Sequence, residues 1–189
     1  LKVIYAKRMM ANARKYNLVP PKLFAVVGRS PQNATMAKVM FTDVCRTQHR
    51  DHAIASVDIG MCYDAVAHGL CSIALQAFGV PMNAIVLTLL TLQTMRFWLR
   101  TAFGDADESF GGTPDDPFYG ISQGGGNAPP SYTATSSVAV VAYKSKGYQP
   151  VLKSAITLTI WTLAAILYVD DTDQLHLADD DQSTEDFML

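Results

Sequence analysis

The chain has few cysteines and no long hydrophobic run. Its 189 residues include only Cys45, Cys62 and Cys71, whose spacing fits neither a disulfide framework nor a zinc site. We therefore expect a reducing, intracellular compartment, and nothing separates nucleus from cytoplasm. The two most apolar stretches, residues 82–95 and 156–169, are shorter than the ~20 residues that a membrane-spanning helix needs. No contact with a membrane is expected.

Bases are scarce in the last part of the chain, and acids are scarce in the first. Residues 1–50 carry ten Lys and Arg and one acid, whereas residues 151–189 carry one base and eight acids. A basic end suits a polyanion and an acidic end suits a metal ion, although a solvated helix face beside an exposed acidic tail at residues 179–185 would give the same pattern. With 49% hydrophobic and 17% charged residues, general disorder is not expected.

The spacing of apolar residues and helix breakers predicts both helices and strands around one sizeable core. Ser30 and Pro31 have the pattern of an N-cap and a first helical residue. The glycine- and proline-rich residues 104–130 are expected to be irregular. The expected helices are residues 2–18, the segment after Ser30, 66–77, a segment from Pro81 through Leu99, and 131–144; the expected strands are 23–27, 54–59 and 156–169, the last as one strand or two.

Two adjacent aspartates close the apolar stretch near the end of the chain. Asp170 and Asp171 follow a run that begins at residue 156 and carries no charge. Paired carboxylates beside a buried strand are costly, because like charges repel and neither is fully solvated. A divalent cation removes most of that cost, and Asp58 offers a third carboxylate from another strand-like run. Three such carboxylates suit paired Mg²⁺ ions, or Mn²⁺ in their place, for in-line phosphoryl transfer.

A glycine-rich segment lies between these two acidic elements. Residues 120–130 contain four glycines and two prolines. Such a turn lets backbone amides approach a ligand closely, and Gln123 within it offers both a donor and an acceptor.

In this order the three elements resemble motifs A, B and C of reverse transcriptases, most closely those of non-long-terminal-repeat retroelements. The resemblance covers nearly the whole chain, and the order and spacing of the motifs make it specific. The residues that carry it are 57–64, 120–130 and 168–171, together with Gly28-Arg29-Ser30, Gln32-Asn33-Ala34 and the protist-like stretch 99–105.

The resemblance implies an α+β fold, the palm of a right-hand polymerase in which an antiparallel sheet packs on helices. It implies partial fingers and no thumb. Residues 1–50 would form partial fingers and their connection to the palm, residues 51–65 and 121–189 the palm, and residues 66–120 a helical insertion and loop.

The same resemblance assigns the metal ligands. Asp58, Asp170 and Asp171 would be the catalytic carboxylates that bind Mg²⁺, with Asp58 and Asp170 as the principal ligands. The carbonyl of Ile59 would be a further oxygen ligand.

It also assigns contacts with the substrate. Tyr63 would pack against the incoming sugar and exclude a ribose 2′-hydroxyl. Gln123 and Gly124 would contact the incoming nucleotide and the template, and Tyr168 would lie beside the primer terminus.

Each of these residues has a simpler interpretation as well. The Asp-Asp pair could be an ordinary turn or helix cap. Tyr63 could be a core residue, and Gln123 could brace a loop. Asp64 is expected to be a helix N-cap, and His68 a packing or surface residue.

The family pattern is incomplete in this chain. Ala128-Pro129 stands where the family usually has Ser-Pro, and the fingers strands and the thumb would lie before Leu1 and after Glu185. We therefore expect an internal fragment of a longer polyprotein that binds metal weakly and is inactive in isolation. Its expected partners are an RNA template, a DNA primer, deoxynucleoside triphosphates and the missing fingers, thumb and endonuclease segments.

Two other functions fit part of the pattern. An RNA-dependent RNA polymerase shares the palm carboxylates, but Val169 before the paired aspartates and Tyr63 at the sugar position favour a reverse transcriptase. A degenerate retroelement copy without catalytic activity, retaining only metal or nucleic-acid binding, is the other alternative.

Overall fold

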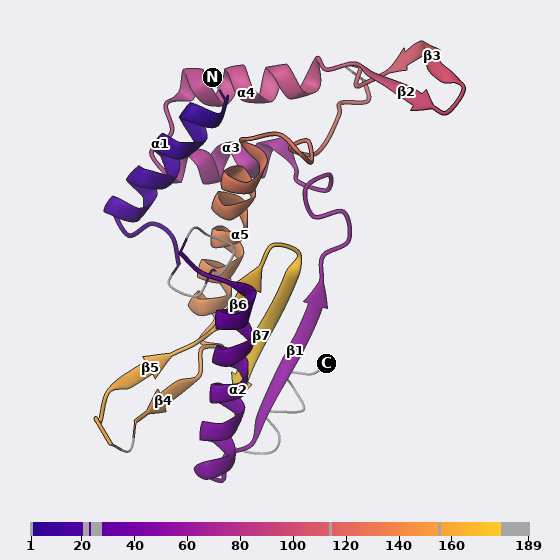
Figure 1. The fold of residues 1–189 in the computed structure, drawn as a ribbon. Helices are drawn as coiled ribbons and strands as arrows, with labels where there is room; N and C mark the ends of the chain where they lie inside the picture. Colours follow the sequence, from indigo (N-terminus) through magenta and orange to yellow (C-terminus); the bar gives the residue numbers. More distant parts are fainter. Residues whose placement is uncertain (1, 21–22, 24–27, 114, 155, 179–189) are drawn as a thin grey trace. The chain divides into compact units, whose positions relative to one another are not determined.

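The computed structural model describes residues 2–20, 23, 28–113, 115–154 and 156–178, which form two compact units (Figure 1). The first unit consists of Leu1–Leu18 and Met61–Thr135, and the second of Val19–Gly60 and Ser136–Leu189. The described residues form five helices and three small antiparallel sheets, which confirms the predicted α+β class. None of the described helices is both long enough and apolar enough to cross a bilayer. The division into fingers and palm stays a prediction.

The main sheet lies in the second unit. Its strand order is β1 (His52–Asp58), β7 (Asp171–Leu177), β6 (Ala165–Tyr168), with antiparallel pairing throughout. The strand predicted at 54–59 is thus β1, and the run predicted at 156–169 forms two strands, β5 (Ile160–Thr162) and β6. Strand β5 pairs with β4 (Val151–Lys153) in a separate hairpin.

Helix α2 (Pro31–Thr47) begins as the sequence predicts. The Ser30 side chain accepts a hydrogen bond from the Asn33 backbone N–H, and the Asn33 side chain accepts one from the Ser30 backbone N–H. This capping box satisfies two donors that the helix itself leaves unpaired, and Pro31 has no N–H to satisfy. The start of α2 is therefore fixed locally.

Apolar side chains cover both faces of the main sheet. On one face, Phe41 and Cys45 of α2 pack with Ile166 and Leu175, together with Leu152 and Leu163. On the other face, Val140 packs with Ala165, Leu167 and Leu23. Val140 belongs to helix α5 (Ala128–Ser145), whose residues from Ser136 onward belong to the second unit. In this unit the sheet is therefore a central layer between two helices.

The first unit is mainly helical. It contains α1 (Lys2–Lys15), α3 (His68–Ala77), α4 (Met82–Gln93) and the beginning of α5. The predicted packing role of His68 is confirmed, because its buried Nε2 lies 2.7 Å from the Gly120 carbonyl oxygen, and the Gln93 amide contacts its Nδ1.

Two predictions for the first unit are wrong because a hairpin forms there. Leu99 lies in strand β2 (Phe97–Thr101) instead of extending α4, and β2 pairs with β3 (Gly104–Phe110), which was predicted to be irregular. Phe97 stacks on Phe110 across the pair, with ring centroids 5.5 Å apart. The Arg100 guanidinium donates two hydrogen bonds to Asp105, which holds the pKa of that carboxyl below its usual range. These cross-strand contacts outweigh the weak strand preference of glycine and aspartate.

One cap prediction is also wrong. Helix α3 has Ala67 as its N-cap, with no side-chain cap, whereas the backbone N–H of Asp64 donates to Met61 in the preceding turn. The predicted strand at 23–27 is described only at Leu23, which forms a parallel bridge with Leu167. The acidic segment 179–185 lies outside the described residues.

Candidate metal and nucleotide site

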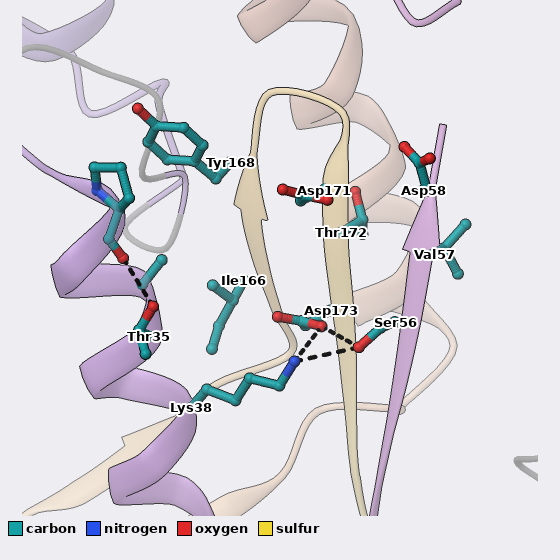
Figure 2. A pocket seen from close by; sticks show the side chains of 12 residues that line it. Thr35, Lys38, Ser56, Val57, Asp58, Ile166, Tyr168, Asp171, Thr172 and Asp173 are labelled. Atoms are coloured by element: carbon teal, nitrogen blue, oxygen red, sulfur yellow. Dashed lines mark hydrogen bonds and ion pairs between the residues drawn. The ribbon is translucent and has the colours of Figure 1, made fainter. Parts of the chain in front are cut away.

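The two predicted acidic elements meet at one end of the main sheet. Asp58 of β1 lies directly opposite Asp171 of β7, and Tyr168 of β6 lies opposite Asp171 on its other side. Residues directly opposite in an antiparallel pair share one face and have Cβ atoms about 4.5–5.5 Å apart. Figure 2 shows both carboxylates at this end of the sheet. The pairing register of β1 with β7 therefore brings together Asp58 and Asp171, two of the three predicted carboxylates.

Asp170 lies in the turn of the β6–β7 hairpin. The turn consists of Val169 and Asp170, and the backbone N–H of Ile59 donates to the Asp170 carbonyl over 3.1 Å. This bond ties the residue that follows Asp58 to the turn. The backbone thus keeps all three predicted acids at one end of the sheet, while ligation by their side chains and by the Ile59 carbonyl stays a prediction.

The turn itself has an unusual backbone conformation. Val169 has a φ of 56°, a left-handed value that β-branched residues rarely adopt. A positive φ at the first residue of a two-residue hairpin loop is the position where a type II′ turn takes glycine. Such strain costs of order 1–3 kcal/mol and persists only where the surroundings impose it. Two constraints hold Val169 in this conformation: the pairing of β6 with β7, and the hydrogen bond from the Ile59 N–H to the Asp170 carbonyl.

A further carboxylate on the same face of β7 is already paired. Asp173 is two residues from Asp171, so it projects from the same side of the strand, and it lies opposite Ser56. The Lys38 ammonium of α2 lies 2.7 Å from Asp173 Oδ1 and 3.2 Å from Ser56 Oγ, and the Ser56 hydroxyl donates to the same carboxylate oxygen (Figure 2). Among the described residues, no base forms an ion pair with Asp58 or Asp171.

These side chains line one cavity on the face of the sheet that α2 covers. Its volume is about 470 Å³. The cavity combines carboxylates at one end, a lysine along one wall and an aromatic ring beside the turn. Its lining includes Thr35 and Lys38 of α2, Ser56 and Asp58 of β1, Ile166 and Tyr168 of β6, and Asp171 and Asp173 of β7.

The carboxylate pair has the donor chemistry that a hard divalent cation needs. Two like charges directly opposite each other on one face destabilise a sheet, and a cation between them reverses that effect. In the part of the chain that the structure describes, no three His, Cys, Asp or Glu side chains are gathered tightly enough to bind a metal on their own. Mg²⁺ usually takes one or two carboxylates and completes its shell with waters and substrate phosphates, so the pair fits that ion.

Tyr63 and the glycine-rich segment belong to the first unit, where their backbones are bonded to each other. The Ile121 N–H donates to the Tyr63 carbonyl over 2.9 Å, and the Gly120 N–H donates to the Val66 carbonyl over 3.0 Å. The half-buried Tyr63 ring packs on Tyr132, with centroids 5.2 Å apart. The segment that contains Tyr63 and the glycine-rich segment are therefore neighbours, and the steric role of Tyr63 stays a prediction.

Gln123 lies at the tip of a tight turn. The Gly125 N–H donates to the Ser122 carbonyl over 3.0 Å, and Gly124 has a φ of 88°, the value that a type II turn requires at its third residue. The Gln123 side chain is exposed at this turn. Its contact with a nucleotide, and that of Gly124, stay predictions.

Comparison with known proteins adds evidence at the level of fold. No protein-family model matches the chain, and no curated protein sequence matches it significantly. Among solved structures, the chain is similar to apo telomerase from Candida tropicalis truncated from its C-terminal domain, with a TM-score of 0.51 and 10% sequence identity. The chain shares a fold with part of a telomerase. The similarity covers 97% of this chain and 34% of the telomerase chain, so this chain spans about a third of that protein.

The sequence did not indicate the three polar residues of the cavity that contact one another. Lys38, Ser56 and Asp173 were not predicted as site residues. The alternation of strand side chains offered a signal for two of them, because Ser56 and Asp173 are each two residues from a predicted carboxylate and share its face. Lys38 had no such signal, since its place depends on how α2 packs on the sheet.

Proposed function

We propose that this chain contributes the catalytic centre of an RNA-directed DNA polymerase, a reverse transcriptase of the non-long-terminal-repeat retroelement type. The single observation that carries the proposal is the register that sets Asp58 against Asp171 beside the Asp170 turn. The fold shared with part of a telomerase, a polymerase related to reverse transcriptases, supports it. The substrates would be a deoxynucleoside triphosphate and a DNA primer on an RNA template.

In this proposal Asp58 and Asp171 hold a divalent cation from two adjacent strands, and Asp170 contributes from the turn. Bound Mg²⁺ supplies the positive charge that lowers the pKa of the primer 3′-hydroxyl and neutralises the phosphates. The strands fix the separation of the carboxylates before substrate arrives, because their register is set by backbone hydrogen bonds. Such preorganisation can account for several kcal/mol of a barrier.

Tyr168 is proposed to support the primer. It lies on the same face as Asp171, next to the turn, and lines the cavity with its ring. An aromatic ring there gives the terminal sugar or base a flat apolar surface. Tyr63, Gln123 and Gly124 are proposed to contact the incoming nucleotide from their own segment.

Primer extension by the complete protein that contains this chain tests the proposal. The substrate is an RNA template annealed to a labelled DNA primer, with Mg²⁺ and deoxynucleoside triphosphates. We expect extension that Asp58→Asn, Asp170→Asn and Asp171→Asn each reduce at least ~100-fold, since each removes charge stabilisation of the transition state. Asp43→Asn, an exposed acid on α2, is the matched control and should retain activity.

Three results would contradict the proposal. Extension that survives all three substitutions would remove the carboxylates from catalysis. Extension with ribonucleotides alone would indicate an RNA polymerase. A folded protein that binds primer and template but extends nothing would indicate a copy without catalytic activity.

A further inference from the structure

One lysine reaches the acidic face of the sheet and contacts a single carboxylate there. Asp58, Asp171 and Asp173 all project from the face that lines the cavity. The Lys38 ammonium contacts Asp173 Oδ1 at 2.7 Å and Ser56 Oγ at 3.2 Å. Of the three carboxylates, Asp173 therefore forms an ion pair with Lys38, whereas Asp58 and Asp171 form none with it.

The ion pair of Asp173 affects metal binding because Asp173 lies close to Asp171 along β7. Alternate residues of a strand are about 6.5–7 Å apart and share one face. For a cation held at Asp171, Asp173 is therefore the nearest other carboxylate on that face of β7. An unpaired Asp173 could therefore accept a cation and displace it along the strand. Its side chain is 20% exposed and that of Lys38 is 37% exposed, so solvent screens their attraction only partly.

Side chains other than Lys38 anchor α2 on the sheet. Phe41 and Cys45 of the same helix are 2% and 0% exposed in the core, and the Ser30 capping box fixes the start of the helix. The contact of Lys38 with Asp173 is thus available for a function other than packing.

We propose that Lys38 is a positioning residue, which restricts divalent-cation binding to the Asp58–Asp171 pair by occupying Asp173. This inference rests on the proposed function, because it assumes that the pair is the cation site. Ser56 assists by donating a hydrogen bond from its hydroxyl to the carboxylate oxygen that Lys38 contacts. The ion is thereby kept at the end of the sheet beside the Asp170 turn.

Mn²⁺ binding to the 189-residue chain, followed by electron paramagnetic resonance, tests the inference without an activity assay. Lys38→Met keeps most of the apolar stem and removes the charge. We expect this variant to bind Mn²⁺ on the order of 5–30-fold more tightly or to take up an additional ion, because Asp173 becomes a ligand. Lys38→Arg should restore the wild-type titration. Lys153→Met, which removes an exposed lysine of β4 outside this cavity, is the matched control and should change affinity less than about twofold.

A second substitution identifies the carboxylate responsible. Asp173→Asn in the Lys38→Met chain should abolish the gain, which a purely structural role of Lys38 would not predict. A Lys38→Met titration equal to wild type, or an equal gain in Lys153→Met, would overturn the inference. A wild-type chain that binds no Mn²⁺ would contradict the metal site of the proposed function. The inference would then fall together with that site, whereas a wild-type chain that binds Mn²⁺ and a Lys38→Met chain with the same titration would overturn the inference alone.

Discussion

Asp58 and Asp171 stand directly opposite each other where β1 and β7 end, on the face that lines the cavity. Both side chains are exposed, so solvent reduces their repulsion without removing it. The described part of the chain supplies no ion pair to either of them. In the absence of a cation this end of the sheet is therefore destabilised by its own charge.

Removing one of these charges should stabilise the metal-free chain. We expect Asp171→Asn to raise the free energy of unfolding by about 0.2–1 kcal/mol in the presence of a chelator, because a like-charged cross-strand pair is removed. The same substitution should cancel any stabilisation by Mg²⁺ or Mn²⁺. Urea unfolding with chelator and with each metal measures both effects. Asp43→Asn is the control, and a loss of stability in Asp171→Asn with chelator would argue against repulsion.

Replacing Val169 by glycine should relieve strain in the hairpin turn. Val169 has a φ of 56°, which costs a β-branched residue more than it costs glycine. We expect Val169→Gly to raise the free energy of unfolding by about 0.5–1 kcal/mol, the relief of strain exceeding the added chain entropy. Val169→Ile retains the strain and should not stabilise. Urea titration compares the three chains, and a destabilised glycine variant would show that the Val169 side chain matters more than its backbone.

Gly120 should be intolerant of a side chain. A Cβ at this position would lie 2.7 Å from Asp64 Cα and 2.8 Å from its carbonyl oxygen, and Gly120 has a φ of +87°. Gly147 has a similar φ of +84° with nothing within 4 Å, so it isolates the cost of backbone strain. We expect Gly147→Ala to cost about 1 kcal/mol and Gly120→Ala about 2–4 kcal/mol, since backbone atoms cannot move aside easily. Thermal unfolding measures the loss of stability in each variant. Equal losses in Gly120→Ala and Gly147→Ala would mean that the 61–66 and 120–121 segments are not in close contact.

Stability should fall at alkaline pH through Tyr143. Burial raises its pKa to about 12 from the usual 10.0, with nearby Tyr148 as a smaller cause, and its hydroxyl donates to the Leu175 carbonyl. The unfolded chain therefore releases this proton first, and the stabilisation present below pH 10 is lost as pH rises towards 12. Burial also raises the pKa of the Cys45 and Cys71 thiols, which contribute to the same trend.

Tyr143→Phe separates the tyrosine from the thiols. Urea unfolding at pH 9 and at pH 11 should show a smaller loss of stability in this variant than in the wild type, because phenylalanine has no proton to release. An identical loss in both chains would assign the alkaline trend to other groups.

Tyr63 should discriminate between sugars in the complete, active protein. We expect Tyr63→Val to increase ribonucleotide incorporation relative to deoxyribonucleotide by roughly tenfold or more, because a smaller side chain admits a 2′-hydroxyl. Primer extension with each nucleotide type measures the ratio. Tyr132→Phe is the control, because it alters the ring that packs on Tyr63 and leaves Tyr63 itself unchanged. Unchanged discrimination would leave Tyr63 as a packing residue.

Local signals in the sequence predicted several elements correctly. Ser30 and Pro31 mark the start of α2 because capping depends on residues only three apart. The apolar run that ends at Asp58 is β1, and the paired aspartates fall at the β6–β7 hairpin. The β2–β3 hairpin was missed, since Gly104–Phe110 becomes a strand through its pairing with Phe97–Thr101 rather than through its own composition.

The sequence by itself determined the presence of both helices and strands, the cap of α2 and the three acids that end two apolar runs, because these depend on residue type and short-range periodicity. Tertiary structure alone decided that Asp171, rather than Asp170, lies opposite Asp58, since register is set by the whole ladder of backbone hydrogen bonds. It also decided that Lys38 lies against Asp173, 135 residues away along the chain. Contacts at such separation follow from the packing of α2 on the sheet, and no local pattern encodes them.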